Sequence, residues 1–184
     1  MRKSLRGFFQ KNPWKKETLL AYYYSAKFRM EIWLLPAGRM KKTWGREDRE
    51  SAETESVESY RQATRISRIV NKVCDKTPWE SKCLVRALTA QRLLYRRGLP
   101  STLYLGCGME DGKMVAHAWL RCGEFYVTGG DGSGYTTVAR FYREGENHVG
   151  NLGNRRSVSR PDRRAKTEPH RKASGRGTAD AAVL

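Results

Sequence analysis

Cys83 and His117 are the residues of this chain whose types and positions could perform acyl-transfer chemistry. Cys83 lies near the start of a predicted helix, where free backbone N–H groups and the helix dipole lower the pKa of a thiol. The same N–H groups can stabilise an oxyanion during acyl transfer. His117 lies between two alanines in an apolar segment with strand-like alternation. A nucleophilic cysteine at a helix start and a histidine base on a strand of the following sheet are typical of cysteine acyl-transfer sites.

Each of these two residues also has a structural interpretation. Cys83 could be a small buried hydrophobic residue, because cysteine is often buried. His117 could be a hydrogen-bonded side chain of the core, which is the commoner role of a single histidine in an apolar strand. The two residues together favour catalysis more than either does alone.

A third group should orient the imidazole, and Asp131 is the candidate. It follows His117 by 14 residues and lies in the run Gly-Gly-Asp-Gly, after the next predicted strand. A hairpin would bring that strand back beside His117, so a carboxylate near its end could reach the ring. The alternative is a turn aspartate, since Asp is common in Gly-rich turns. Glu124 is a weaker candidate, because it lies at the tip of a predicted turn.

The other three cysteines are Cys74, Cys107 and Cys122. A zinc site made by Cys107, His117 and Cys122 is conceivable, but strand alternation points Cys122 away from His117. The spacings also match no common zinc pattern. We therefore expect these cysteines to be packing residues, and we expect neither a metal nor a cofactor.

A helix and a sheet are predicted to position the site. The run 77–80 (Thr-Pro-Trp-Glu) is typical of a helix start, with the threonine as cap, the proline at the first helical position and the glutamate completing a capping box. Ser81 is an alternative cap one step later in the chain. Gly98 is expected to end this helix, and Pro100 follows it. After Pro100 the apolar period changes to two, which predicts strands at 102–107, 115–122, 125–128 and 136–142, with turns at 110–112 and 123–124.

The N-terminal part of the chain is predicted to be helical. Apolar residues recur at helical spacing between residues 14 and 35, and Pro36 should end that helix. Lys27, Arg29 and Glu31 interrupt the segment, and a membrane span tolerates few such charges, so a packed or interfacial helix is favoured. A weak contact with a membrane surface could coexist with catalysis. We expect a short basic connector at 38–45, a loop in 47–59 and a second helix up to about residue 73.

The net charge of +17 is concentrated at the two ends of the chain. Residues 1–50 hold 13 Lys/Arg and 5 Asp/Glu, residues 51–150 hold 14 and 11, and residues 151–184 hold 9 and 3. We predict a basic helical segment at 1–50, a catalytic domain at 51–150 and a disordered basic tail at 151–184. A basic surplus favours anionic partners, but the near balance of the middle segment makes nucleic-acid binding an unfavoured alternative.

The cysteines contain no CxxC pair, and the segment MRKSLRGFF lacks the apolar run and cleavage site of a signal peptide. Disulfides are therefore not expected, and the predicted compartment is the reducing cytoplasm.

Three segments resemble a known family when they are taken together. They are Lys-Cys-Leu-Val-Arg-Ala-Leu-Thr-Ala-Gln (82–91), Arg-Gly-Leu-Pro (97–100) and His-Ala-Trp (117–119). They resemble the transglutaminase-like cysteine peptidase of lasso-peptide biosynthesis, a leader peptidase similar to the C-terminal domain of the microcin-processing B protein. The resemblance covers about residues 79–141, and residues 14–44 also look like the N-terminal part of the stand-alone form.

The resemblance implies an α+β fold of the papain/transglutaminase type, with N-terminal helices followed by an antiparallel sheet. It implies that Cys83 is the nucleophile and that His117 is the base and acid. The implied substrate is a ribosomally made precursor peptide, cut between leader and core. The implied partners are a separate leader-binding protein and a macrocyclase. The family often has its acidic residue where this chain has Thr128-Gly129, and the basic tail has no counterpart in the family pattern.

One alternative shares the fold and the residues Cys83, His117 and Asp131 but not the reaction. In a transglutaminase-like acyltransferase an amine, and not water, would resolve the acyl-enzyme. The other alternative is a basic nucleic-acid-binding module without catalysis.

Overall fold

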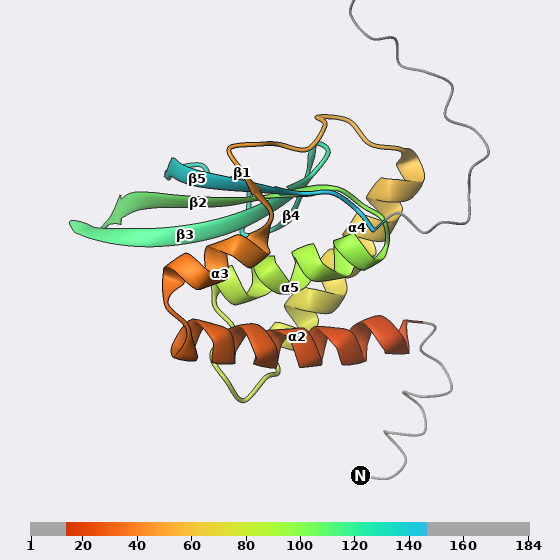
Figure 1. The fold of residues 1–184 in the computed structure, drawn as a ribbon, viewed down its shortest axis with the longest axis horizontal. Helices are drawn as coiled ribbons and strands as arrows, with labels where there is room; N and C mark the ends of the chain where they lie inside the picture. Colours follow the sequence, from red (N-terminus) through yellow and green to blue (C-terminus); the bar gives the residue numbers. More distant parts are fainter. Residues whose placement is uncertain (1–13, 147–184) are drawn as a thin grey trace, which may run out of the picture. The chain divides into compact units, whose positions relative to one another are not determined.

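The computed structural model describes residues 14–146, in which helices come first and the main sheet follows (Figure 1). The helices are α2 (Lys15–Leu34), α3 (Ala37–Trp44), α4 (Val57–Cys74) and α5 (Cys83–Arg96). The strands are β1 (Arg46–Glu47), β2 (Ser101–Glu110), β3 (Lys113–Cys122), β4 (Phe125–Thr128) and β5 (Thr136–Arg143). The five strands form one antiparallel sheet in the order β1-β5-β2-β3-β4. The predicted α+β class is therefore confirmed.

The core lies between the helices and one face of the sheet. In Figure 1, α5 lies between the sheet and α2, and it packs against both β3 and α2. Alternation on β3 turns Ala118, Leu120 and Cys122 toward the helices, where all three are buried. Burying apolar side chains from both layers is the main stabilising contribution to such a fold.

The N-terminal helices share this core with the rest of the described chain. Tyr24 and Phe28 of α2 and Met40 and Trp44 of α3 belong to the same buried cluster as the sheet residues. The ring of Trp44 lies edge-on to Phe141 of β5, with centroids 5.3 Å apart. The structure thus continues one core across residue 50, where we expected a boundary. The connector predicted at 38–45 is wrong in its structure, because apolar side chains at helical spacing let residues 37–44 bury one face of a helix.

The helix that carries Cys83 begins later than predicted. Residues 77–82 are not helical, and α5 starts at Cys83 itself. The Thr77 hydroxyl is not a cap; it lies 3.1 Å from the carbonyl oxygen of Cys74 and 2.9 Å from Ser81 Oγ. These contacts stabilise the turn that follows α4. The predicted capping box is therefore wrong, and the correction moves Cys83 to the first helical position.

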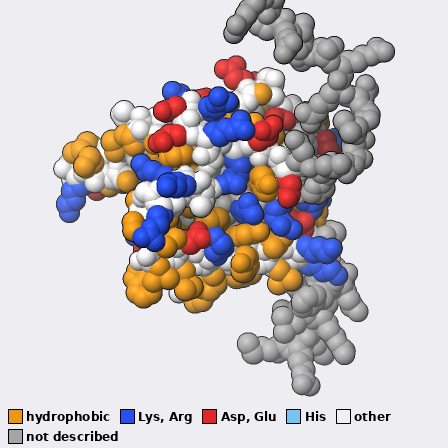
Figure 2. Space-filling model, in the orientation of Figure 1, with side chains coloured by type: hydrophobic (Ala, Val, Ile, Leu, Met, Phe, Trp, Pro, Cys, Tyr) orange, Lys and Arg blue, Asp and Glu red, His pale blue; other side chains and the backbone are white. Residues whose placement is uncertain are grey.

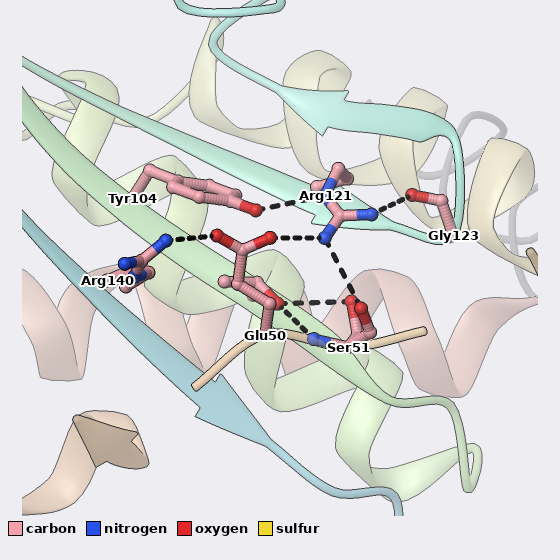
Figure 3. Close-up of polar contacts among 7 residues, drawn as sticks. Glu50, Ser51, Tyr104, Arg121, Gly123 and Arg140 are labelled. Carbon is pink, nitrogen blue, oxygen red and sulfur yellow. Dashed lines mark hydrogen bonds and ion pairs between the residues drawn. The ribbon is translucent and has the colours of Figure 1, made fainter. Parts of the chain in front are cut away.

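The other face of the sheet is covered by a polar network that includes the loop after β1 (Figure 3). Arg121 of β3 is 8% exposed and donates to the hydroxyl of Tyr104 at 3.0 Å and to the carbonyl of Gly123 at 2.9 Å. It also pairs with Glu50 at 3.0 Å, and Glu50 accepts a second bond from Arg140 at 2.6 Å. The loop is thereby tied to β2, β3 and β5.

Burial acts to raise the pKa of the Glu50 carboxyl, but hydrogen bonds from Arg140 and Tyr104 and the charge of Arg121 outweigh it. The pKa of Glu50 is therefore held below its usual value. The carboxylate stays charged and keeps both arginines paired at neutral pH.

Helix α2 has one face in the core and leaves several large apolar side chains in solvent. No helix of the described part is long and apolar enough to cross a bilayer. The predicted contact of this helix with a membrane surface stays a prediction. The basic tail predicted at 151–184 lies outside the described residues. The exposed large apolar side chains of α2 are Leu19, Tyr23, Met30, Trp33 and Leu34.

Candidate active site

Cys83 is the first residue of α5 and is half-buried, with its side chain packed against the core. The helical ladder begins when the Arg86 N–H donates to the carbonyl of Lys82 at 3.0 Å. The N–H groups of residues 83–85 precede that ladder and point toward the N-terminal end of the helix. The first turn of α5 holds no acidic residue. The thiol thus lies at the N-terminal end of the helix, beside free backbone N–H groups.

Two of the other cysteines are buried, and the structure makes them poor nucleophiles. Burial raises the pKa of the Cys122 thiol to about 12. Burial also raises the pKa of Cys74 above its usual value. Within residues 14–146 no three His, Cys, Asp or Glu side chains are grouped so that they could hold a metal ion. Cys83, in contrast, is partly exposed and lies at a helix start.

His117 is held by one backbone hydrogen bond. Its Nε2 lies 2.7 Å from the carbonyl oxygen of Gly129. Because a carbonyl oxygen can only accept, Nε2 must carry the hydrogen. In the neutral ring the lone pair is then on Nδ1, so this nitrogen is the one that can take a proton from a nucleophile. A backbone carbonyl here fixes the tautomer that a general base needs.

Aromatic rings hold the plane of the imidazole. The ring of Tyr135 stacks on His117 with centroids 4.6 Å apart and planes 23° apart. Trp119, two residues along β3, lies 6.0 Å from the imidazole and stacks on Tyr104 at 5.5 Å. The Tyr135 hydroxyl donates to Glu110 near the hairpin tip. The imidazole is therefore restrained by stacking as well as by its hydrogen bond.

The segment between β4 and β5 must pass close to the sheet to make these contacts. Gly129 has φ +80°, and a Cβ there would lie 2.9 Å from Trp119 Cα. On β2, Gly106 and Gly108 lie beneath this segment, and a Cβ on either would collide with it or with Trp119. The lack of a Cβ at these three glycines therefore lets the segment between β4 and β5 reach His117.

Asp131 makes a local turn. Its Oδ1 accepts a hydrogen bond from the Ser133 N–H at 2.9 Å, and this bond lowers the pKa of the carboxyl. The hydrogen bond recorded for the His117 ring goes to Gly129, two residues earlier. The turn interpretation thus describes the contact that Asp131 makes, and a role in orienting the imidazole stays a prediction. Glu124 is exposed, and its N–H donates to the Tyr60 hydroxyl at 3.2 Å.

Cys83 and His117 belong to different elements, α5 and β3. Alternation places His117 on the face of Tyr104 and Trp119, whereas α5 packs on the face of Ala118 and Leu120. Tyr135 connects the two candidates. Its pKa is raised by the hydrogen bond to Glu110, by burial, by the charge of Glu110 and, least of the four, by a coulombic interaction with Cys83.

Direct contact between the thiol and His117 Nδ1 stays a prediction. β4 pairs with β3 only from Leu120 to Cys122, so the edge of β3 beside His117 has no strand neighbour on that side among the described residues.

Sequence reasoning missed two parts of this site, the carbonyl of Gly129 and the ring of Tyr135. The position of Gly129 could have indicated the contact, because it directly follows a predicted strand, where the leader-peptidase family often has its acidic residue. A backbone carbonyl is present in every residue type, so only the spacing from His117 could have predicted this acceptor.

The sequence-family model of the transglutaminase-like superfamily matches residues 28–141, which is more than half of the chain. No curated protein and no solved structure matches the chain significantly. The matched range contains Cys83, His117, Gly129 and Tyr135.

Proposed function

Because the chain belongs to the transglutaminase-like superfamily, we propose that it is a cysteine peptidase which removes the leader from a ribosomally made precursor peptide in lasso-peptide biosynthesis. The superfamily is compatible with cysteine-dependent acyl transfer. The observation that carries the proposal is the hydrogen bond from His117 Nε2 to the Gly129 carbonyl, because it leaves Nδ1 as a base. The three segments that resemble the leader peptidase provide the substrate class.

In the proposed reaction the Cys83 thiol gives its proton to His117 Nδ1, and the sulfur attacks the carbonyl carbon of the scissile peptide bond. The N–H groups at the start of α5 stabilise the resulting oxyanion. The C–N bond then breaks as the imidazolium returns its proton to the leaving amine. The product is a thioester between Cys83 and the leader.

Water resolves the thioester in the second half of the reaction. His117 Nδ1 takes a proton from the water as its oxygen attacks the carbonyl carbon, and the C–S bond breaks. The thiolate recovers the proton, and the leader leaves with a new carboxylate. Neither half of this reaction consumes ATP or an oxidant.

A separate leader-binding protein is expected to deliver the precursor, and a macrocyclase is expected to use the product. The described residues ahead of Cys83 form three helices and a two-residue strand, so they supply no small β-containing recognition module. The exposed apolar surface of α2 has the character of a partner surface. We expect the leader-binding protein to contact it.

The contact of the partner with α2 can be tested with two surface substitutions. Trp33 is 78% exposed and Leu34 is 58% exposed, so changing both to Ser should leave the fold intact and weaken partner-dependent cleavage. Val57→Ser is a matched control, because Val57 is 69% exposed at the start of α4. If the double variant loses binding to anionic vesicles and keeps partner-dependent cleavage, α2 serves a membrane surface instead.

The acyltransferase alternative differs in the second nucleophile only. Cleavage in ¹⁸O-labelled water with an added primary amine separates the two reactions by product mass. One ¹⁸O atom in the leader carboxylate indicates hydrolysis, whereas an amide of the added amine indicates acyl transfer.

The nucleic-acid alternative is weakened by the charges of the described surface. Basic and acidic side chains are interspersed on the face in Figure 2, and several arginines are paired with carboxylates. Binding of duplex DNA that falls steeply with salt, together with no cleavage of the precursor, would favour this alternative.

Mass spectrometry of the precursor incubated with this protein and the leader-binding protein tests the main proposal. Wild type should yield separate leader and core masses, and Cys83→Ala should yield neither while keeping the melting temperature. Cys107→Ala is the matched control, because Cys107 is a half-buried cysteine on β2, outside the helix start. Cleavage by Cys83→Ala at the wild-type rate would end the proposal.

A further inference from the structure

The hairpin of β2 and β3 projects beyond the helices, and one of its edges is open. β4 pairs with β3 from Leu120 to Cys122, whereas β3 begins at Lys113. In Figure 1 the hairpin extends past the helical layer, and Figure 2 shows hydrophobic side chains at this projecting end. Within residues 14–146 no strand pairs with residues 113–119 of β3 on this side.

The register of the hairpin decides which backbone groups face the open edge. Glu110 and Lys113 flank a two-residue turn, Asp111-Gly112, in which both residues have positive φ. The pair that closes such a turn exchanges hydrogen bonds, and hydrogen-bonded and non-hydrogen-bonded pairs then alternate along the ladder. The N–H and C=O groups of Val115 and His117 therefore point to β2, and those of Met114 and Ala116 point to the open edge.

The turn between β3 and β4 gives the same assignment independently. Cys122 and Phe125 close a two-residue turn, so the backbone N–H and C=O groups of Cys122 point to β4. Met114 and Ala116 lie an even number of residues away and share this direction. Ala118 also shares it, but its carbonyl lies against Gly129. The open stretch thus ends immediately beside His117.

We propose, resting on the proposed function, that the precursor peptide binds as an extended strand on this edge, with backbone hydrogen bonds to Met114 and Ala116. A strand added here would lie about 4.8 Å from β3. The peptide would therefore pass beside His117 of β3, whose ring stacks on Tyr135 in the segment between β4 and β5. Backbone pairing supplies affinity for any extended peptide, and side-chain contacts add preference.

Apolar side chains beside the open edge fit such an occupant. Met114 is 77% exposed and Met109, directly opposite on β2, is 68% exposed. Methionine is unbranched and adapts to different side chains, which suits a surface that contacts a peptide. Ala116 is exposed and small, so it leaves room for the added strand.

Among the described residues β5 also has an open edge, because β1 pairs there with Phe141 and Tyr142 only. Val138 is 64% exposed there. Both β5 and β2 would lie between a peptide on this edge and His117 of β3. The position of the base therefore favours the β3 edge.

Amide hydrogen exchange of the Cys83→Ala chain, measured by NMR with the leader-binding protein and saturating full-length precursor, tests this inference. The amides of Met114 and Ala116 should exchange at least about 10-fold more slowly when the precursor is added. The amides of Val115 and His117 should change little, because they are already bonded to β2. Unchanged exchange at Met114 and Ala116, or slowing along β5 instead, would overturn the inference.

A backbone substitution gives a second test. Ala116→Pro removes the N–H that should bind the peptide, and proline is tolerated where an edge N–H faces solvent. We expect kcat/KM for precursor cleavage to fall by about 3- to 10-fold, the value of one backbone hydrogen bond. Val57→Pro is the matched control and should cleave like wild type, because it places a proline at an exposed first helical position of α4, outside the proposed edge site.

Wild-type cleavage by Ala116→Pro would refute the edge site. Because Cys83→Ala would still abolish cleavage in that case, failure of the edge site and failure of the proposed function are distinguishable.

Discussion

Gly129→Ala should disconnect the imidazole of His117 from its backbone acceptor. Gly129 has φ +80°, which costs a residue with a Cβ about 1–2 kcal/mol. The added Cβ would also lie 2.9 Å from Trp119 Cα and closer still to the Ala118 carbonyl oxygen. Both neighbours are backbone atoms of a central strand, so the loop must move. A shift of about 1 Å would break the 2.7 Å bond between Nε2 and the Gly129 carbonyl.

Gly130→Ala is the matched control. Gly130 has φ +68°, and its Cβ would meet nothing within 4 Å. It therefore has a similar conformational cost without the collision. The difference between the two variants isolates the displacement of the carbonyl from the general destabilisation of the loop.

Loss of the orienting bond should lower kcat for precursor cleavage by on the order of 10²- to 10⁴-fold, the usual contribution of a positioned general base. Gly130→Ala should keep kcat within a few-fold of wild type, with a melting temperature lowered by roughly 2–8 °C. The assay is single-turnover cleavage followed by mass spectrometry, with thermal unfolding of both variants. If Gly129→Ala cleaves as fast as Gly130→Ala, the carbonyl does not set the tautomer of His117.

Three further outcomes are expected. Iodoacetamide should modify Cys83 well before Cys122, whose pKa is about 12, and peptide mapping of the modified protein measures the order. The pKa of Glu50 is lowered on folding, so its contribution to stability should be complete above the unfolded pKa of about 4.3 and be lost as the pH falls through the lower folded value; Glu50→Gln should flatten that part of a stability-against-pH curve. Tyr135→Phe keeps a ring on the imidazole and should retain most cleavage, whereas Tyr135→Ala should lower kcat more than it changes KM; equal activity of the two variants would contradict a positioning role.

The polar network of Glu50 and Arg121 is connected indirectly to the segment that holds His117. The network of Glu50 and Arg121 fixes Tyr104, and Trp119 stacks on Tyr104 at 5.5 Å. Trp119 in turn lies beneath Gly129. The loop after β1 is therefore linked through aromatic contacts to the segment that holds His117.

Much of the fold was predictable from local patterns. Periods of 3.6 and 2 located α2, α4 and the strands β2 to β5, because these elements bury apolar side chains in the same core. The choice of Cys83 and His117 as candidate nucleophile and base rested on residue type and order alone, and it stays a prediction. The predicted start of α5 was wrong because Thr77 and Glu80 have the residue types of a capping box. In the structure the Thr77 hydroxyl instead contacts the Cys74 carbonyl and Ser81 in the turn after α4.

By itself the sequence determined the α+β class, the nucleophile and base candidates and the resemblance to leader peptidases. Tertiary structure alone decided that β1 pairs with β5, that residues 37–44 join the core and that Gly129 holds His117. These features depend on contacts between residues far apart in the chain, and a backbone carbonyl is the same in every residue type. Local preference therefore cannot encode them, and packing selects them.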